Sequence, residues 1–255
     1  MTESVCFDRA AGYYDETRSL PGEQMDLLVS RLIAELPREG LCLEIGIGTG
    51  RIALPLMRGG IRMVGIDISA EMLRKLVDKA AAVPVAIADA TRLPFADRTF
   101  HSAIASHVMH LIPGWKTALD ELMRVVVPGG VVLASRAGGS RSEWHRAVKR
   151  HFYVEAGDPP WPPGIDTIEQ IDDEMRSRGA VVRKIEDVNS EGSSSISSLL
   201  AGLEKGIESA CWSIDDETRR RAVAATREWA KSELGDLDAP RPVAHVSDWR
   251  AYRLG

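Results

Sequence analysis

The feature that most constrains the fold is a glycine-rich loop directly behind an apolar segment, within residues 41–56. Residues 41–45 are apolar except for one acidic side chain, Glu44, and an apolar helical stretch, 52–57, follows the loop. Three glycines alternate between them: Gly46, Gly48 and Gly50. Because glycine has no Cβ, such a strand–loop–helix unit brings backbone N–H groups and a helix N-terminus close to a ligand. The pattern predicts a binding loop for a polar ligand that carries an adenosine or a phosphate.

The spacing of the glycines indicates which ligand the loop suits. Dinucleotide-binding loops read G-x-G-x-x-G, and their third glycine allows close helix packing. Here the spacing is G-x-G-x-G, and Arg51 stands where that third glycine belongs. The carboxylate of Glu44 would repel a pyrophosphate but attract the ammonium of an amino acid. The loop therefore favours a cationic, phosphate-free adenosyl ligand over NAD.

A second apolar run, residues 62–66, ends in Asp67. An acidic residue at the end of the second strand of such a sheet is placed to accept both hydroxyls of a ribose, although NAD enzymes use the same device. Ser69 is predicted as the N-cap of a helix over 70–80. The alternative for Asp67 is a second capping residue.

Strands and helices alternate over the first half of the chain, which predicts a parallel, doubly wound α/β sheet. Further strands are predicted at 83–88, 101–106, 131–136 and 181–188, a last strand at 243–254, and helices at 116–126, 196–210 and 215–234. Ligands of such sheets bind at the carboxyl ends of the strands. Four segments fall at those ends: residues 44–50, Asp67, Asp89 and residues 106–110.

These motifs give the chain a resemblance to a known family. They are Glu44-Ile-Gly-Ile-Gly-Thr-Gly50, Gly65-Ile-Asp67-Ile-Ser69, Ala88-Asp89-Ala90 leading to Leu93-Pro-Phe95, and Val127-Pro-Gly-Gly130. The chain resembles the class I S-adenosylmethionine-dependent methyltransferases, in particular the small-molecule branch related to the ubiquinone/menaquinone-biosynthesis enzymes. The resemblance implies a mostly parallel, seven-stranded, Rossmann-like sheet with an antiparallel last strand and S-adenosylmethionine as cofactor. It also implies four segments: a helical cover at 1–40, the cofactor-binding core at 41–190, a helical lid at 191–240 and a final core strand at 241–255.

The resemblance also assigns roles at the site. The glycine loop and Glu44 would hold the methionyl part, and Asp67 would bind the ribose. Ile68 and Met72 would flank the adenine, whose amino group would donate to Asp89. The full set of cofactor-binding residues is Tyr14, Arg18, Glu44, Gly46, Ile47, Gly48, Gly50, Asp67, Ile68, Met72, Asp89, Ala90 and Ser106. Tyr14 and Arg18 would cover the cofactor. The alternative, which the sequence supports equally, is that Tyr14 is a surface aromatic and Arg18 a solvated charge.

Methyl transfer from a sulfonium is an in-line displacement on an activated donor, so orientation can account for about 7–11 kcal/mol of the barrier. A general base adds about 10²–10⁴-fold only where the acceptor must lose a proton. The candidates are His107 and His110, which follow the fourth strand; a structural histidine is the alternative for each. Two histidines three residues apart without a third ligand do not predict a metal site.

Other features bound the acceptor and the location. The net charge of −5 disfavours nucleic acid as a partner. The segment after strand four lacks the Asn/Asp-Pro-Pro-Tyr sequence of amide- and adenine-N-methyltransferases, which favours a small molecule with an oxygen, nitrogen or carbon nucleophile. Three cysteines without a C-x-x-C pair, and no long apolar run, predict a cytoplasmic protein without a membrane span. Substrate selectivity is expected in the lid, and Trp161, among prolines, is a further lid candidate. The alternatives are an NAD-dependent oxidoreductase or a non-catalytic S-adenosylmethionine-binding protein.

Overall fold

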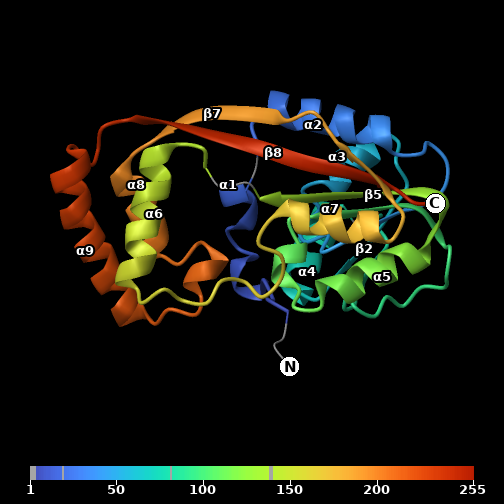
Figure 1. The fold of residues 1–255 in the computed structure, drawn as a ribbon, viewed down its shortest axis with the longest axis horizontal. Coiled ribbons are helices and arrows are strands. Elements are labelled where there is room, and N and C mark those ends of the chain that lie inside the picture. The colour runs from blue at the N-terminus through green and yellow to red at the C-terminus, as the bar shows by residue number, and fades with distance from the viewer. Residues whose placement is uncertain (1–3, 19, 81, 138–139) are drawn as a thin grey trace. The chain divides into compact units, whose positions relative to one another are not determined.

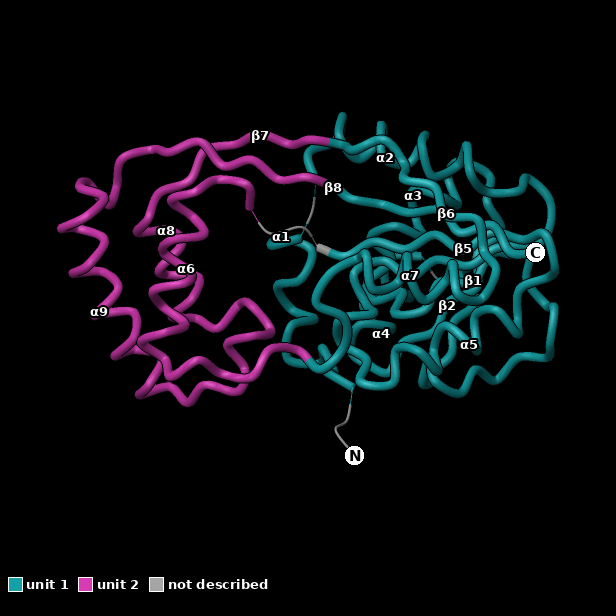
Figure 2. The backbone as a smooth tube through the Cα atoms, viewed as in Figure 1, with its two compact units in different colours: residues 1–137, 163–188, 247–255 teal, residues 138–162, 189–246 magenta. Residues whose placement is uncertain are grey.

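The computed structural model of the protein describes residues 4–18, 20–80, 82–137 and 140–255. The chain forms two compact units, drawn in different colours in Figure 2. Unit 1 comprises residues 1–137, 163–188 and 247–255, and unit 2 comprises residues 138–162 and 189–246. Unit 2 therefore takes in the predicted lid together with residues 138–162, which the sequence alone had assigned to the core.

Among the described residues, eight strands form a single sheet in the order β3-β2-β1-β4-β5-β8-β6, with β7 paired to β8. The strands are β1 (Cys42–Ile45), β2 (Met63–Asp67), β3 (Val85–Ile87), β4 (Phe100–Ser106), β5 (Val126–Ala137), β6 (Val181–Lys184), β7 (Val188–Ser194) and β8 (Arg241–Arg253). Strands β1 to β5 pair in parallel, and β8 is antiparallel to β5 and β6. The prediction of a mostly parallel sheet with an antiparallel last strand is confirmed, with one strand more than expected.

The central position of β1 follows from its composition. All four of its residues are buried, which suits an apolar strand covered on both faces. It pairs with β2 on one side and β4 on the other, and Ile45 lies in register with Ile66 and Ala105. The carboxyl ends of these three strands therefore meet at the same edge of the sheet.

Helices cover both faces of the sheet in unit 1 (Figure 1). They are α2 (Gly22–Glu35), α3 (Ala53–Arg58), α4 (Ala70–Lys79), α5 (Trp115–Val125) and α7 (Ile168–Ser177). Alternate residues of β1 point to opposite faces of the sheet. Leu43 packs in the apolar core with α5 and α7, and Cys42 packs in the core with α2, α3 and α4. This alternation along a buried strand is what a doubly wound fold requires.

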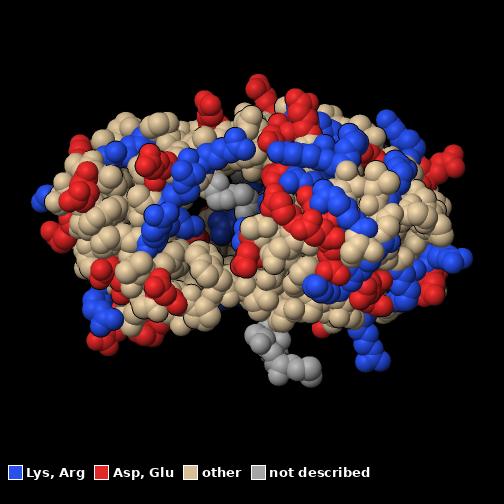
Figure 3. Space-filling view, in the orientation of Figure 1, with Lys and Arg blue, Asp and Glu red and all other residues tan. Residues whose placement is uncertain are grey.

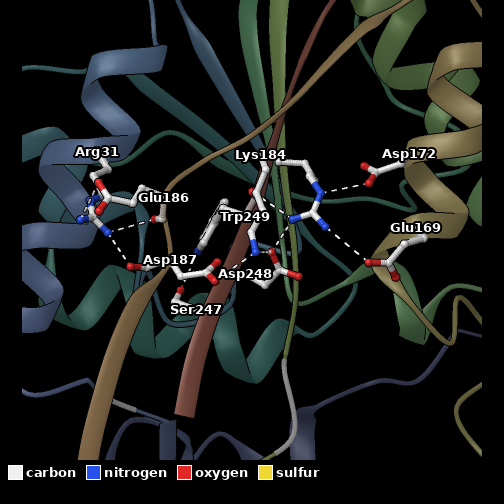
Figure 4. A network of polar contacts seen from close by, with 10 residues as sticks. Arg31, Glu169, Asp172, Lys184, Glu186, Asp187, Ser247, Asp248 and Trp249 are labelled. Carbon is white, nitrogen blue, oxygen red and sulfur yellow. Dashed lines mark hydrogen bonds and ion pairs between the residues drawn. The ribbon is translucent and has the colours of Figure 1, made fainter. Parts of the chain in front are cut away.

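The predicted strand over 181–188 is interrupted. Strand β6 ends at Lys184, and β7 begins at Val188. Between them, Nη1 of Arg31 donates to the carbonyl oxygens of Glu186 and Asp187 at 3.0 and 2.7 Å (Figure 4). Because a side chain on α2 occupies these two carbonyl groups, the ladder stops there, and the prediction of one continuous strand is wrong.

A polar network fastens β8 to α7. The guanidinium of Arg250 is buried and donates from Nε to Asp172 at 3.0 Å, and it also pairs with Asp248 (Figure 4). The hydroxyl of Tyr252 donates to the other oxygen of Asp172 at 2.8 Å. A buried arginine is tolerated here because carboxylates surround it. Strand β8, from the end of the chain, is thereby held in the core.

Unit 2 is built around three helices, α6 (Glu143–Glu155), α8 (Ile196–Glu204) and α9 (Asp216–Leu234). They share an apolar core that includes Phe152, Leu200 and Val223. Helix α8 ends at Glu204, and Ser209–Cys211 form a separate 3₁₀ turn, so the predicted helix over 196–210 is too long. No helix in the described part of the chain is both long and apolar enough to cross a membrane.

Candidate active site

A pocket opens at the carboxyl edge of β1, β2 and β4, entirely within unit 1. It is where a doubly wound sheet is expected to bind its ligand. Ten of the predicted site residues line it: Tyr14, Gly46, Gly48, Asp67, Ile68, Met72, Asp89, Ala90, Ser106 and His107. Five do not: Arg18, Glu44, Ile47, Gly50 and His110.

The glycine loop brings its backbone close to neighbouring side chains. Gly46 and Gly48 have φ of 63° and 55°, in the left-handed region that favours glycine. A Cβ on Gly46 would lie 2.5 Å from Cγ2 of Val108, and a Cβ on Gly48 would lie 3.1 Å from Cε of Met72. Both positions therefore require glycine, and both present backbone to the pocket.

Asp67 joins the loop to the second strand. Its Oδ2 accepts the backbone N–H of Gly48 at 2.9 Å, and its Oδ1 accepts that of Ser69 at 2.8 Å. Burial raises the pKa of Asp67 above its ordinary value, and the two N–H donors oppose this shift. Ser69 itself caps α4, because its hydroxyl accepts the N–H of Met72 at 3.1 Å. The predicted cap is confirmed, and Asp67 instead holds the loop.

Asp89 presents one free carboxylate oxygen at the pocket. Its Oδ1 accepts the N–H and the hydroxyl of Thr91 at 2.8 and 2.9 Å. Within the described part of the chain, Oδ2 has no hydrogen-bond partner. Because the first oxygen fixes the carboxylate, the second is oriented to accept a hydrogen bond from a ligand.

The N-terminal segment is bound to the core beside the pocket. Oδ1 of Asp8 accepts the hydroxyl of Ser69 at 2.6 Å and the N–H of Glu71 at 3.2 Å. Further along, Oδ1 of Asp15 accepts the hydroxyl of Thr49 at 2.6 Å, and Asp15 forms an ion pair with Lys79. These contacts fix α1 (Tyr14–Arg18) and the turn before it against the glycine loop and α4.

Two aromatic rings on this segment line the pocket. Phe7 and Tyr14 meet edge to face with their centroids 6.0 Å apart. Arg18, predicted to act with Tyr14, does not line the pocket, although its charge is among those that lower the pKa of His107. Phe7 was not predicted as a site residue. It is an aromatic residue in the same N-terminal segment as Tyr14, and this feature of the sequence could have indicated it.

Three predicted residues of the loop region lie behind the pocket. Glu44 is 2% exposed, and its Oε2 has no hydrogen-bond partner among the described residues. Burial raises its pKa to about 8, against the opposing effect of Arg51. Ile47 fills the space over Gly65, and a Cβ on Gly50 would lie 2.4 Å from Leu76. Glu44 lies in β1, where strand alternation turns its side chain to a helix-covered face, whereas Ile47 and Gly50 lie in the following loop and pack against β2 and α4.

The two histidines occupy different environments. His107 lines the pocket and has a left-handed φ of 52°, which is strained for a residue with a Cβ. Burial and the nearby charge of Arg51 hold the pKa of His107 well below its ordinary value. His110 lies outside the pocket lining, burial lowers its pKa to about 4, and its buried Nδ1 has no partner among the described residues.

The pocket also has apolar residues that sequence reasoning missed. They are Val5, Val108, Leu111 and Ile112. The backbone N–H of Val5 donates to the carbonyl oxygen of Leu111 at 3.1 Å, so the N-terminal segment pairs with the loop that follows β4. The apolar run after His107 was a usable signal, whereas the pairing with Val5 depends on the folded chain.

Known proteins are similar to this chain in sequence and in fold. Residues 43–134 match the family described as "Methyltransferase domain". The chain is 35% identical over 157 residues to the demethylmenaquinone methyltransferase of Streptomyces avermitilis, covering 60% of this chain and 68% of that protein. It is 33% identical over 145 residues to the malonyl-[acyl-carrier protein] O-methyltransferase of Pseudescherichia vulneris, covering 56% of this chain and 57% of that protein. The crystal structure of the YcgJ protein from Bacillus subtilis superposes with a TM-score of 0.63 at 16% identity, covering 92% of this chain and 100% of that one.

The sheet order and the superposition define a class I methyltransferase fold, in which the glycine loop and two acidic strand ends lie at one pocket. The chain belongs to the S-adenosylmethionine-dependent methyltransferases, and S-adenosylmethionine is its cofactor. The predicted family, fold class and cofactor are thereby confirmed. Neither the NAD-dependent oxidoreductase nor the non-catalytic alternative finds support in these relatives.

Proposed function

We propose that the chain methylates a small-molecule acceptor, with the cofactor bound in the pocket of unit 1. The observation that carries the proposal is Asp67, which lines the pocket while its two oxygens hold Gly48 and Ser69. A carboxylate fixed in this way keeps lone pairs on both oxygens for the hydroxyls of a ribose. The residue that shapes the loop is thus the residue that would recognise the nucleoside.

The remaining pocket residues fit the other parts of S-adenosylmethionine. Ile68 and Met72 supply apolar surface for the adenine, and the free oxygen of Asp89 faces the same pocket to accept its amino group. The backbone of Gly46 and Gly48 would approach the methionyl part. Glu44, buried with one unpartnered oxygen behind the loop, supplies a negative charge when a cationic ligand lowers its pKa.

Bound S-adenosylmethionine supplies a methyl group already activated by a sulfonium. The protein's own residues then have to orient the reactants and exclude water. Phe7 and Tyr14 cover the pocket from the N-terminal segment, and His107 lines it. His107 is the pocket residue that could accept a proton from an acceptor that must lose one, although its lowered pKa makes the imidazole a weak base.

Two lines of support favour a small acceptor. The curated relatives are named for demethylmenaquinone and for a malonyl group on an acyl-carrier protein. The net charge of −5 disfavours nucleic acid as the acceptor, because its phosphates would be repelled by the excess of acidic groups. We further infer a cytoplasmic location from the three unpaired cysteines, two of which are buried; fractionation of the expressing cells would test it.

Calorimetric titration with S-adenosylmethionine, S-adenosylhomocysteine and NAD tests the cofactor assignment. The two sulfur nucleosides should bind and NAD should not. Transfer of a labelled methyl group from S-adenosylmethionine to a metabolite extract, followed by separation of the labelled products, would then identify the acceptor. Binding of NAD alone, or label appearing only in nucleic acid, would overturn the proposal.

A further inference from the structure

Unit 2 contains a pocket of its own, with a cavity of about 290 Å³. That is close to the lower end, roughly 300 Å³, of sites that hold small molecules. Side chains of α6 and of the proline-rich segment after it line the pocket. The ones that matter for recognition are Arg146, Lys149, Arg150, Tyr153, Asp158 and Trp161.

Two of the cations in this pocket have no acidic partner. Arg146 and Arg150 stand four residues apart on α6, so they lie on one face of the helix, where like charges repel. Neither forms an ion pair with any described residue. Lys149, between them, pairs with Glu208 at 2.5 Å. Figure 3 shows Lys and Arg side chains gathered over this part of unit 2.

The other polar groups of the pocket do not cancel this charge. Glu208 is engaged by Lys149 and by the hydroxyl of Tyr153, which donates to it at 3.1 Å. His145 is uncharged at neutral pH, because burial lowers its pKa to about 4. Asp158 is the remaining acidic residue of the lining, against two arginines. The pocket therefore carries a net positive charge.

An exposed aromatic ring completes the site. Trp161 is 63% exposed, which is unusual for a large apolar side chain. Its ring is tilted 58° to that of Tyr153, with the centroids 5.3 Å apart. Prolines on both sides of Trp161 restrict its backbone, so the ring is presented to the pocket at little entropic cost. A flat apolar group can pack against this indole.

We propose that the unit 2 pocket binds an acidic aromatic molecule, whose carboxylate or phosphate pairs with Arg146 and Arg150 and whose ring packs on Trp161. Guanidinium groups suit this purpose because they bind carboxylate and phosphate in a bidentate manner. The proposal goes beyond the proposed function, because it assigns a second ligand site to unit 2 from the lining of that unit alone.

The test is titration of the full chain with benzoate, phenyl phosphate, inorganic phosphate and the neutral isostere benzamide. At least one aromatic anion should bind, more tightly than inorganic phosphate and much more tightly than benzamide. The double variant Arg146→Gln/Arg150→Gln should weaken that binding at least about tenfold, and Trp161→Ala should weaken it less. The matched control is Arg220→Gln/Arg221→Gln, two exposed arginines of α9 outside the pocket, which should leave binding unchanged.

Three results would overturn the proposal: no binding of either aromatic anion, equal binding of benzamide, or equal loss in both double variants. S-adenosylmethionine titrated into the same samples separates this failure from that of the proposed function. If the cofactor binds and the anions do not, the unit 2 site is wrong while the methyltransferase assignment stands. Circular dichroism of each variant, together with unchanged cofactor affinity, shows that the variants are folded.

Discussion

The pocket of unit 1 is lined largely by loop backbone and fixed side chains, whereas the pocket of unit 2 is lined by long side chains of one helix. In unit 1 a ligand would meet loop backbone and short side chains that are themselves held by hydrogen bonds, as Asp67 is by Gly48 and Ser69. In unit 2 a ligand would meet two long side chains of a single helix, Arg146 and Arg150, which form no ion pair with the described residues. The family match, residues 43–134, lies wholly within unit 1. A pocket made of backbone demands a fixed spacing of glycines and acids, and so leaves a pattern that can be read in the sequence.

The largest test of this comparison concerns the buried carboxyl of unit 1. Burial raises the pKa of Glu44 from 4.5 to about 8, so between these values the folded chain binds more protons than the unfolded chain. The contribution of Glu44 to the free energy of unfolding should therefore fall as pH rises through this window, by as much as about 5 kcal/mol. In Glu44→Gln this contribution should vanish. Urea unfolding at pH 5 and pH 8.5 measures it.

Glu39→Gln, at an exposed position, is the control and should keep the wild-type pH dependence. An unchanged slope in Glu44→Gln would show that this carboxyl is ionised in the folded chain. Histidines act in the opposite direction in both units, because burial lowers the pKa of His110 in unit 1 and of His145 in unit 2 to about 4. Below pH 6.5 the unfolded chain takes up the proton more readily than the folded one, so stability falls as pH falls there.

The next effect separates packing from binding within the glycine loop. In Gly50→Ala, the left-handed φ of 80° costs about 1–2 kcal/mol and the contact with Leu76 about 1–3 kcal/mol more. The free energy of unfolding should fall by about 2–5 kcal/mol in urea titrations. Gly60→Ala is matched, with φ of 91° and no atom within 4 Å of the new Cβ, and should lose the conformational part alone. If the two variants lose the same free energy of unfolding, the contact between residue 50 and Leu76 of α4 does not contribute to stability.

The sequence predicts the features that depend on local residues, and it does not predict those that depend on contacts between distant parts of the chain. The order of β1 to β5 and the pocket positions of Gly46, Gly48, Asp67 and Asp89 were predictable, because strand periodicity and loop spacing are local. Which residues turn away from the pocket was not: Gly50 and Ile47 share the motif but pack under neighbouring elements. That outcome depends on helix α4 and on β2, which meet the loop only in the folded chain.

The parts missed by sequence reasoning depend on partners distant in the chain. The strand over 181–188 has suitable composition throughout, but Arg31 takes its carbonyl groups and divides it. Residues 138–162 continue directly from β5, yet α6 packs with α8 and α9 and so belongs to unit 2. Charge on α6 is visible in the sequence, but the pocket becomes visible only when Trp161 and Tyr153 are brought beside it.

A smaller effect is expected from the ribose carboxylate. Asp67→Ala should weaken S-adenosylmethionine binding by about 1–3 kcal/mol, because a charged hydrogen-bond acceptor is lost and the N–H of Gly48 is released. Benzoate binding in unit 2 should not change, since its lining lies elsewhere in the chain. Asp78→Ala, an exposed residue of α4, is the control. Unchanged cofactor affinity in Asp67→Ala would remove this residue from the site.

The smallest effect tests whether unit 2 has a stability of its own. Oδ1 of Asp215 caps α9 by accepting the N–H of Thr218 at 2.9 Å, and hydrogen bonds from this helix end lower the pKa of Asp215. Asp215→Ala should lower the stability of α9 slightly, because its N-cap is lost, with Ser213→Ala at a nearby exposed position as control. If the two units unfold independently, amide hydrogen exchange in Asp215→Ala should become faster in α8 and α9. The amides of β1 and β4 should then keep their wild-type protection. Equal acceleration in both units would show a single cooperative structure, in which the backbone-built and side-chain-built pockets cannot be altered independently.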